Sequence, residues 1–78
     1  MSREQTAAEG SYQHLNRVVV AFLQGRKDLE SAVRAILDAH SREQIRAVLL
    51  NEVERYRRFN GQRFRDLVER LRLRGMLW

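Results

Sequence analysis

The sequence predicts an all-α protein, a small bundle or orthogonal array of four helices. Three observations lead to this fold class. Apolar residues recur at three- and four-residue steps along most of the chain, no segment alternates with a period of two, and proline is absent. The chain has 78 residues, which is the length of one domain. Such a short chain has a thin core, so its stability depends on helix packing and, where it occurs, on self-association.

The first helix is expected over about 11–24, after a disordered and polar N-terminal tail of residues 1–10. Residues 11–78 then form a single helical domain. Ser11 is suited to cap the helix, and Gly25 stands where a left-handed C-cap belongs. The apolar stripe of this helix consists of Tyr12, Leu15, Val18, Val19, Phe22 and Leu23.

Three further helices are expected over about 28–39, 42–59 and 62–74. Asp28 caps the second helix, and the run Ser41-Arg42-Glu43-Gln44 has the pattern of a capping box at the start of the third. Asn60-Gly61 should end the third helix because both residues tolerate positive φ, and Gly75 should end the fourth. The inward residues of the three helices are Leu29, Val33, Ile36 and Leu37; Ile45, Val48, Leu49, Val53, Tyr56 and Phe59; and Phe64, Leu67, Val68 and Leu71.

Charge is unevenly distributed along the chain, whose formal net charge is +5. Residues 1–54 contain seven bases and eight acids, whereas residues 55–78 contain eight arginines and two acids. A cationic segment on a nearly neutral remainder indicates a polyanionic partner. We expect a non-enzymatic regulator that binds nucleic acid, and DNA in particular.

The expected phosphate contacts are the arginines of the last two helices, because guanidinium groups suit phosphate oxygens. At 100° per residue, Arg63, Arg70 and Arg74 fall within about 40° of one another, and Arg65 and Arg72 form a second pair. The alternative is a solvated helix flank, partly neutralised by pairs such as Asp66–Arg70. The full predicted set is Arg57, Arg58, Arg63, Arg65, Arg70, Arg72 and Arg74.

A partial helix-turn-helix pattern covers residues 35–48. Small or apolar residues occupy most of the required positions, but Asp38 and His40 stand where apolar residues are usual. If the motif is real, Arg42, Gln44 and Arg46 are candidates for contact with bases.

A protein-binding adaptor or inhibitor is the alternative function. Leu50 and Leu73 lie off the apolar stripes of their helices, and the chain ends in Met76-Leu77-Trp78. Exposed apolar positions of this kind mark docking patches or dimer seams. A homodimer is compatible with either function. The cationic segment from Arg63 onwards also has the pattern of a membrane-surface helix, but a thin core needs the same apolar stripe.

Other classes of protein are disfavoured by the sequence. Without cysteine and with only His14 and His40, we expect no cofactor and no metal site. Ser31, Asp38 and His40 contain the letters of a catalytic triad, but Asp38 and His40 are two apart on a helix and no oxyanion loop accompanies them. The first ten residues lack a signal-peptide pattern and the longest apolar run is Val18–Leu23, so we expect a cytoplasmic protein.

Overall fold

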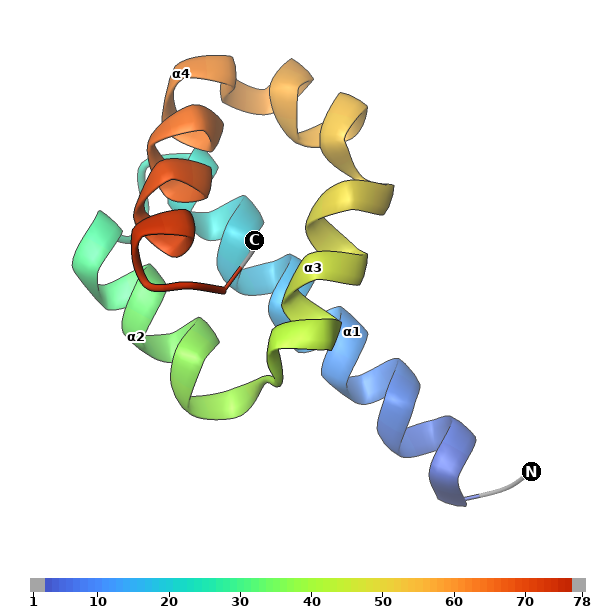
Figure 1. The fold of residues 1–78 in the computed structure, drawn as a ribbon. Helices are drawn as coiled ribbons and strands as arrows, with labels where there is room; N and C mark the ends of the chain where they lie inside the picture. The colour runs from blue at the N-terminus through green and yellow to red at the C-terminus, as the bar shows by residue number, and fades with distance from the viewer. Residues whose placement is uncertain (1–2, 77–78) are drawn as a thin grey trace.

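The computed structural model describes the backbone of residues 3–76 and the side chains of residues 12–76. Four helices make up this part of the chain: α1 (Arg3–Leu23), α2 (Leu29–Ala39), α3 (Arg42–Asn51) and α4 (Val53–Leu73) (Figure 1). No strand occurs between residues 3 and 76, so the all-α prediction is confirmed.

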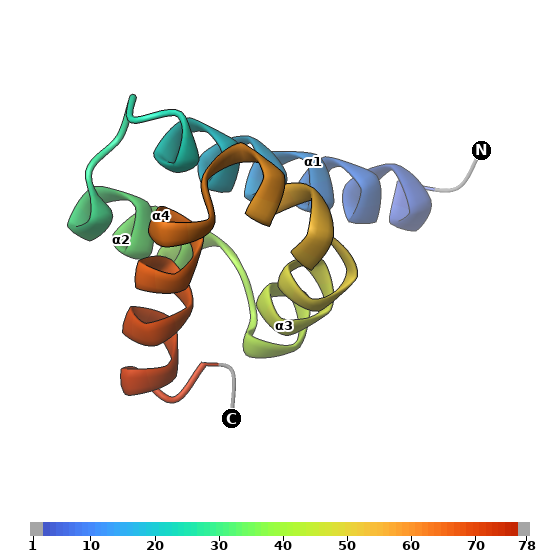
Figure 2. The same ribbon diagram turned by 90° about the horizontal axis from the view of Figure 1, so that it is seen from above.

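Helix α1 packs against each of the other three helices. The chain rises through α3 and the first half of α4, bends, and returns through the second half of α4 beside α2 (Figure 1). That second half runs across α1 rather than along it (Figure 2), so the fold is an array of crossing helices and not an up-and-down bundle.

The first helix begins at Arg3, eight residues before the predicted start. Its first turns project away from the packed helices (Figure 1). The flexibility expected for residues 1–10 stays a prediction, because their side chains lie outside the described part of the chain.

Three predicted helix boundaries are confirmed by their capping geometry. Asp28 accepts the Ser31 amide at 3.1 Å and the Ser31 hydroxyl at 2.7 Å. Ser41 and Gln44 form both hydrogen bonds of the capping box, at 3.1 and 3.2 Å. Gly25 has a φ of 80°, as the left-handed end of α1 requires.

The single helix predicted over residues 42–59 is wrong. The chain breaks at Glu52, whose φ and ψ are −110° and 18°, and the next helix continues through residue 60 with a bend. No side-chain cap marks the break, which is why the sequence does not reveal it.

The predicted break at Asn60 exists but arises differently. Asn60 is extended, with φ −167° and ψ 97°, and neither it nor Gly61 has positive φ. Its side-chain oxygen accepts the Arg63 amide at 3.1 Å, so Asn60 caps the second half of α4.

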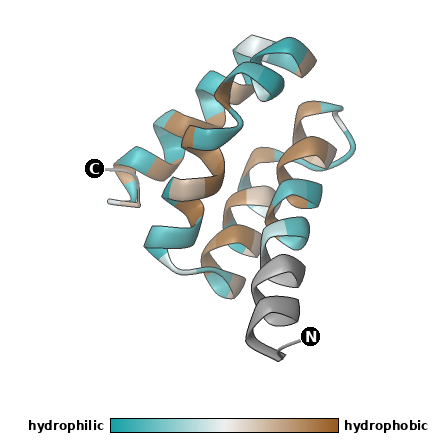
Figure 3. Ribbon diagram, turned by 90° about the vertical axis from the view of Figure 1, so that its right-hand side faces the viewer, coloured by the Kyte–Doolittle hydropathy of each residue, from teal (hydrophilic) through white to brown (hydrophobic). Residues whose placement is uncertain are grey.

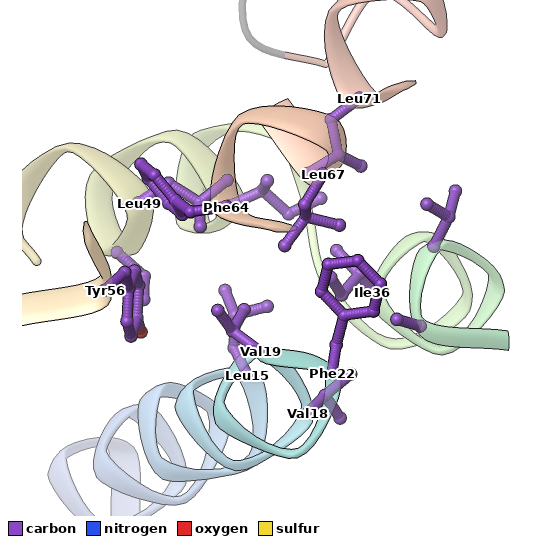
Figure 4. Close-up of a cluster of buried hydrophobic side chains, with 14 of the residues drawn as sticks. Leu15, Val18, Val19, Phe22, Ile36, Leu49, Tyr56, Phe64, Leu67 and Leu71 are labelled. Atoms are coloured by element: carbon purple, nitrogen blue, oxygen red, sulfur yellow. The ribbon is translucent and has the colours of Figure 1, made fainter. Parts of the chain in front are cut away.

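The apolar stripes of all four helices meet in one core, whose labelled side chains point into a common interior (Figure 4). Hydrophobic residues concentrate where the helices face one another (Figure 3). Two residues of the predicted stripes are exposed instead: Tyr12 and Phe59 are 37% and 44% accessible. The core consists of Leu15, Val18, Val19, Phe22, Leu23, Ala32, Val33, Ile36, Ile45, Val48, Leu49, Tyr56, Phe64, Leu67 and Leu71.

Two glycines should respond in opposite ways to alanine. Gly25→Ala should destabilise the fold by about 1 kcal/mol, because a side chain at positive φ is strained although the site is open. Gly61→Ala should leave stability unchanged or raise it by up to about 1 kcal/mol, because Gly61 is helical and its surroundings are also open. Urea denaturation of the two variants measures both effects. Equal stabilities would contradict this account of the α1 terminus.

Candidate nucleic-acid interface

Most arginines whose side chains are described stand in solvent. Within residues 12–76, nine of them are exposed and make neither an ion pair nor a side-chain hydrogen bond with a described residue. They come from every helix and from the α1–α2 link. These nine are Arg17, Arg26, Arg34, Arg42, Arg46, Arg57, Arg58, Arg65 and Arg74.

Arg63 has a structural role. Its Nε donates to the Phe22 carbonyl at 2.7 Å, and its Nη2 donates to the Lys27 carbonyl at 3.1 Å. The guanidinium also lies over the Phe22 ring, 4.2 Å from its centroid. Arg63 therefore satisfies carbonyl groups near the C-terminus of α1 and ties α4 to that helix, so it is turned away from an external phosphate.

Arg70 and Arg72 also have partners. Arg70 pairs with Glu30 of α2, and not with Asp66, which instead accepts from Gln62 at 3.2 Å. Arg72 pairs with Glu69 at 3.1 Å on the surface of its own helix. The Arg70–Glu30 pair bridges two helices, whereas the Arg72–Glu69 pair lies within one helix. Both pairs are exposed, and exposed ion pairs contribute little to stability.

Apart from Arg72, which pairs with Glu69, the predicted phosphate contacts divide into two groups. Arg57, Arg58, Arg65 and Arg74 are exposed and have no partner among residues 12–76. Arg63 and Arg70, from the same predicted stripe, face the seam between α4 and the first two helices. Helical spacing placed them on one flank correctly, but that flank is partly a packing surface.

The geometry around residues 35–48 does not favour a helix-turn-helix. Helices α2 and α3 have little direct contact, because each packs on α1 instead. In a helix-turn-helix the first helix supports the recognition helix. The Gln44 side chain accepts the Ser41 amide and is thereby held in the capping box. Arg42 and Arg46 remain exposed cations on α3.

His14 and His40 form a contact between α1 and the α2–α3 link. His14 Nδ1 and His40 Nε2 are 2.8 Å apart, and the ring centroids are separated by 5.0 Å. His40 Nδ1 is buried and has no partner among the described residues. Burial, together with His14, lowers the pKa of His40 below its ordinary value.

Two residues of the candidate triad have other partners. The Ser31 hydroxyl donates to Asp28, and His40 contacts His14. Among the described residues, no three His, Asp or Glu side chains come together in a way that could hold a metal ion.

The apolar positions of the alternative interface differ in exposure. Leu50 and Leu73 are 51% and 76% accessible. Met76 is half-buried and packs against the core, and Leu77 and Trp78 lie outside the described residues. The exposed Phe59 lines an open groove of about 590 Å³. The other residues of its lining are Asn51, Glu52, Glu54, Arg55 and Arg58.

Arg17 and Arg26 are surface cations that the sequence analysis did not select. They belong to the nearly neutral part of the chain, so their segment carries no excess charge. The fold brings them to one groove with Arg55 of α4. Only the packing of α4 on α1 reveals this grouping, since the residues are far apart in sequence.

Comparisons of the chain with known protein families, curated proteins and solved structures found no match. Between residues 3 and 76, the helices are too short or too polar for any of them to cross a bilayer. The apolar stripe of the second half of α4 is buried in the core, where it contributes Phe64, Leu67 and Leu71.

Arg63→Gln should destabilise the protein by about 2 kcal/mol, since it removes charged hydrogen bonds to two carbonyls and a cation–π contact. Arg65→Gln is the matched control, because it removes the same charge from an exposed side chain of the same helix. Its stability should stay within about 0.5 kcal/mol of the parent in urea denaturation. Similar losses in both variants would contradict the structural role of Arg63.

Stability should fall as pH drops below about 6.5, the ordinary pKa of histidine. His40 has a lower pKa in the folded protein, so the unfolded chain binds a proton more readily and acid favours unfolding. The contribution is fully present above about pH 6.5 and is lost progressively down to the folded-state pKa. His40→Asn should flatten the dependence of the urea midpoint on pH across this window. An unchanged slope would show that His40 is not the group responsible.

Proposed function

We propose that this protein is a non-enzymatic regulator that binds nucleic acid, DNA in particular, through phosphate contacts from exposed arginines. The observation that carries the proposal is the set of nine exposed arginines with no partner among residues 12–76. Cations that are not neutralised within the protein attract an external polyanion and release its counterions on binding.

The proposed interface uses exposed arginines of the last two helices. Arg63 and Arg70 are left out, because their guanidinium groups hold α4 against the first two helices. Arg72 can still contribute, since a surface pair with Glu69 is weak enough to exchange for a phosphate. The proposed contacts are Arg42, Arg46, Arg57, Arg58, Arg65 and Arg74.

Phosphate contact is favoured over base reading. A recognition helix needs a supporting helix packed against it, and α2 gives α3 little support. Arg57 and Arg58 lie on the first half of α4, before the bend at Asn60, whereas Arg65 and Arg74 come after it. Cations distributed over several surfaces suit a backbone-following mode that is largely independent of sequence.

The alternative function is docking on a partner protein. Leu50 and Leu73 support it, because large apolar side chains this exposed are typical of interfaces. The groove beside Phe59 supports it further, since its two glutamates and two arginines offer groups of both charges to a protein partner. A homodimer through these positions remains compatible with nucleic-acid binding.

Binding to a labelled DNA duplex should weaken linearly in log affinity against log salt, by about 0.9 per phosphate contact. Arg57→Gln and Arg58→Gln should each lower affinity alike for unrelated sequences and reduce the slope by about 0.9. Arg34→Gln removes the same charge from α2, which lies outside the proposed interface, and should change the slope little. Fluorescence anisotropy at several salt concentrations measures all four proteins.

A flat salt dependence, or no binding at low salt, would overturn the proposal. A complex isolated from the host that survives nuclease treatment would favour the partner-protein alternative.

A further inference from the structure

A polar groove runs along α1 where this helix lies beside the first half of α4. Its volume is about 340 Å³. One wall comes from α1, Arg26 of the α1–α2 link stands at one end, and Arg55 comes from α4. The polar residues of the lining are Tyr12, Gln13, Asn16, Arg17, Arg26 and Arg55.

The groove is held in shape by hydrogen bonds between the two helices. The Tyr56 hydroxyl donates to Asn16 Oδ1 at 2.8 Å, and the Tyr12 hydroxyl donates to Glu52 Oε1 at 2.6 Å. Tyr56 is fully buried, so its bond ties the groove to the core. A site whose walls are already fixed loses less entropy when a ligand binds.

Among residues 12–76, the lining carries three guanidinium groups and no carboxylate. Glu52 lies nearby, but it accepts from Tyr12 and its 3.7 Å contact with Arg55 is long. Arg17 and Arg26 are exposed and have no acidic partner among residues 12–76. Three cations therefore face one groove, and of these only Arg55 has a carboxylate partner among residues 12–76.

This arrangement is not the solvated flank of one amphipathic helix. The cations come from α1, from the link after it and from α4, so only the tertiary fold brings them together. A second surface depression contains Arg34 of α2 and Arg74. It also contains the carboxylates Glu30 and Asp38 as counter-charges. The part of the groove along α1 that residues 12–76 form has no such counter-charge in its lining.

We infer that the groove between α1 and α4 is a phosphate-binding site formed by Arg17, Arg26 and Arg55. Guanidinium forks bind phosphate oxygens with two parallel hydrogen bonds, and the Gln13 amide is a further donor. The hydrogen bond to Glu52, together with burial, raises the pKa of Tyr12.

The site would extend the proposed nucleic-acid surface onto α1. Only the identity of the molecule that carries the phosphate depends on the proposed function. If the function is as proposed, the ligand is a backbone phosphodiester. The same chemistry also accepts free phosphate, and the two sources can be separated by experiment.

The test measures thermal unfolding of the full chain during titration with inorganic phosphate, with chloride at matched ionic strength as reference. Phosphate at ten times its Kd should raise Tm by roughly 5–10 °C beyond the chloride effect. The Arg17→Gln/Arg26→Gln double variant should lose most of this rise. Both substituted side chains are exposed and unpaired with described residues, so the variant should fold. Arg34→Gln, another exposed arginine, should keep the rise.

Equal Tm rises in phosphate and chloride, or an unchanged phosphate effect in the double variant, would overturn the inference. Duplex titration of the same proteins separates it from the proposed function. Phosphate protection without any DNA binding would support the groove while the proposed function fails. DNA binding by the parent protein with no phosphate effect would overturn the groove while the proposed function stands.

Discussion

The inner side of α1 carries Leu15, Val19 and Phe22, and the other three helices all pack against it. Burying one such side chain contributes about 1.5–3 kcal/mol. A chain this short has a small core, so the stability of the fold depends on these few side chains. Direct contact of α3 with α2 or α4 is sparse, so α1 is what holds them in one domain. The positions of the surface cations therefore depend on how each helix is seated on α1.

This dependence explains why arginines of the same helix have different roles. The second half of α4 packs beside α2 and across the end of α1, and guanidinium groups at that seam must find partners as they lose water. Arg63 finds carbonyl oxygens and Arg70 finds Glu30. Arg65 points away from the seam and remains hydrated. Composition alone treats these side chains as equivalent cations, whereas the packing separates them.

The features predictable from the sequence are those set by neighbours along the chain. The apolar period placed most of the core, and Asp28, Ser41 and Gly25 marked helix ends through bonds or dihedral angles within a few residues. The break at Glu52 has no such local signal, and Asn60 acts as a cap where positive φ was expected. The candidate site was only half predictable, because the partners of Arg63 and the grouping of Arg17 with Arg55 are contacts between distant segments.

A compositional preference for arginine explains which cation this chain uses, but it does not explain where carboxylates are missing. The acids of the described chain are largely placed where they stabilise the fold: Asp28 caps α2, Glu30 bridges to α4, and Glu69 pairs on its own helix. Cations that gather without counter-charge repel one another and destabilise a thin-cored fold. A carboxylate beside Arg17 would relieve that repulsion, and among residues 12–76 the lining of the groove contains none, whereas Arg26 also lies near Asp28 on its other side. The arrangement is unfavourable for folding alone and favourable for capturing an anion, so the position of the arginines, and not their number, is what indicates an anionic ligand.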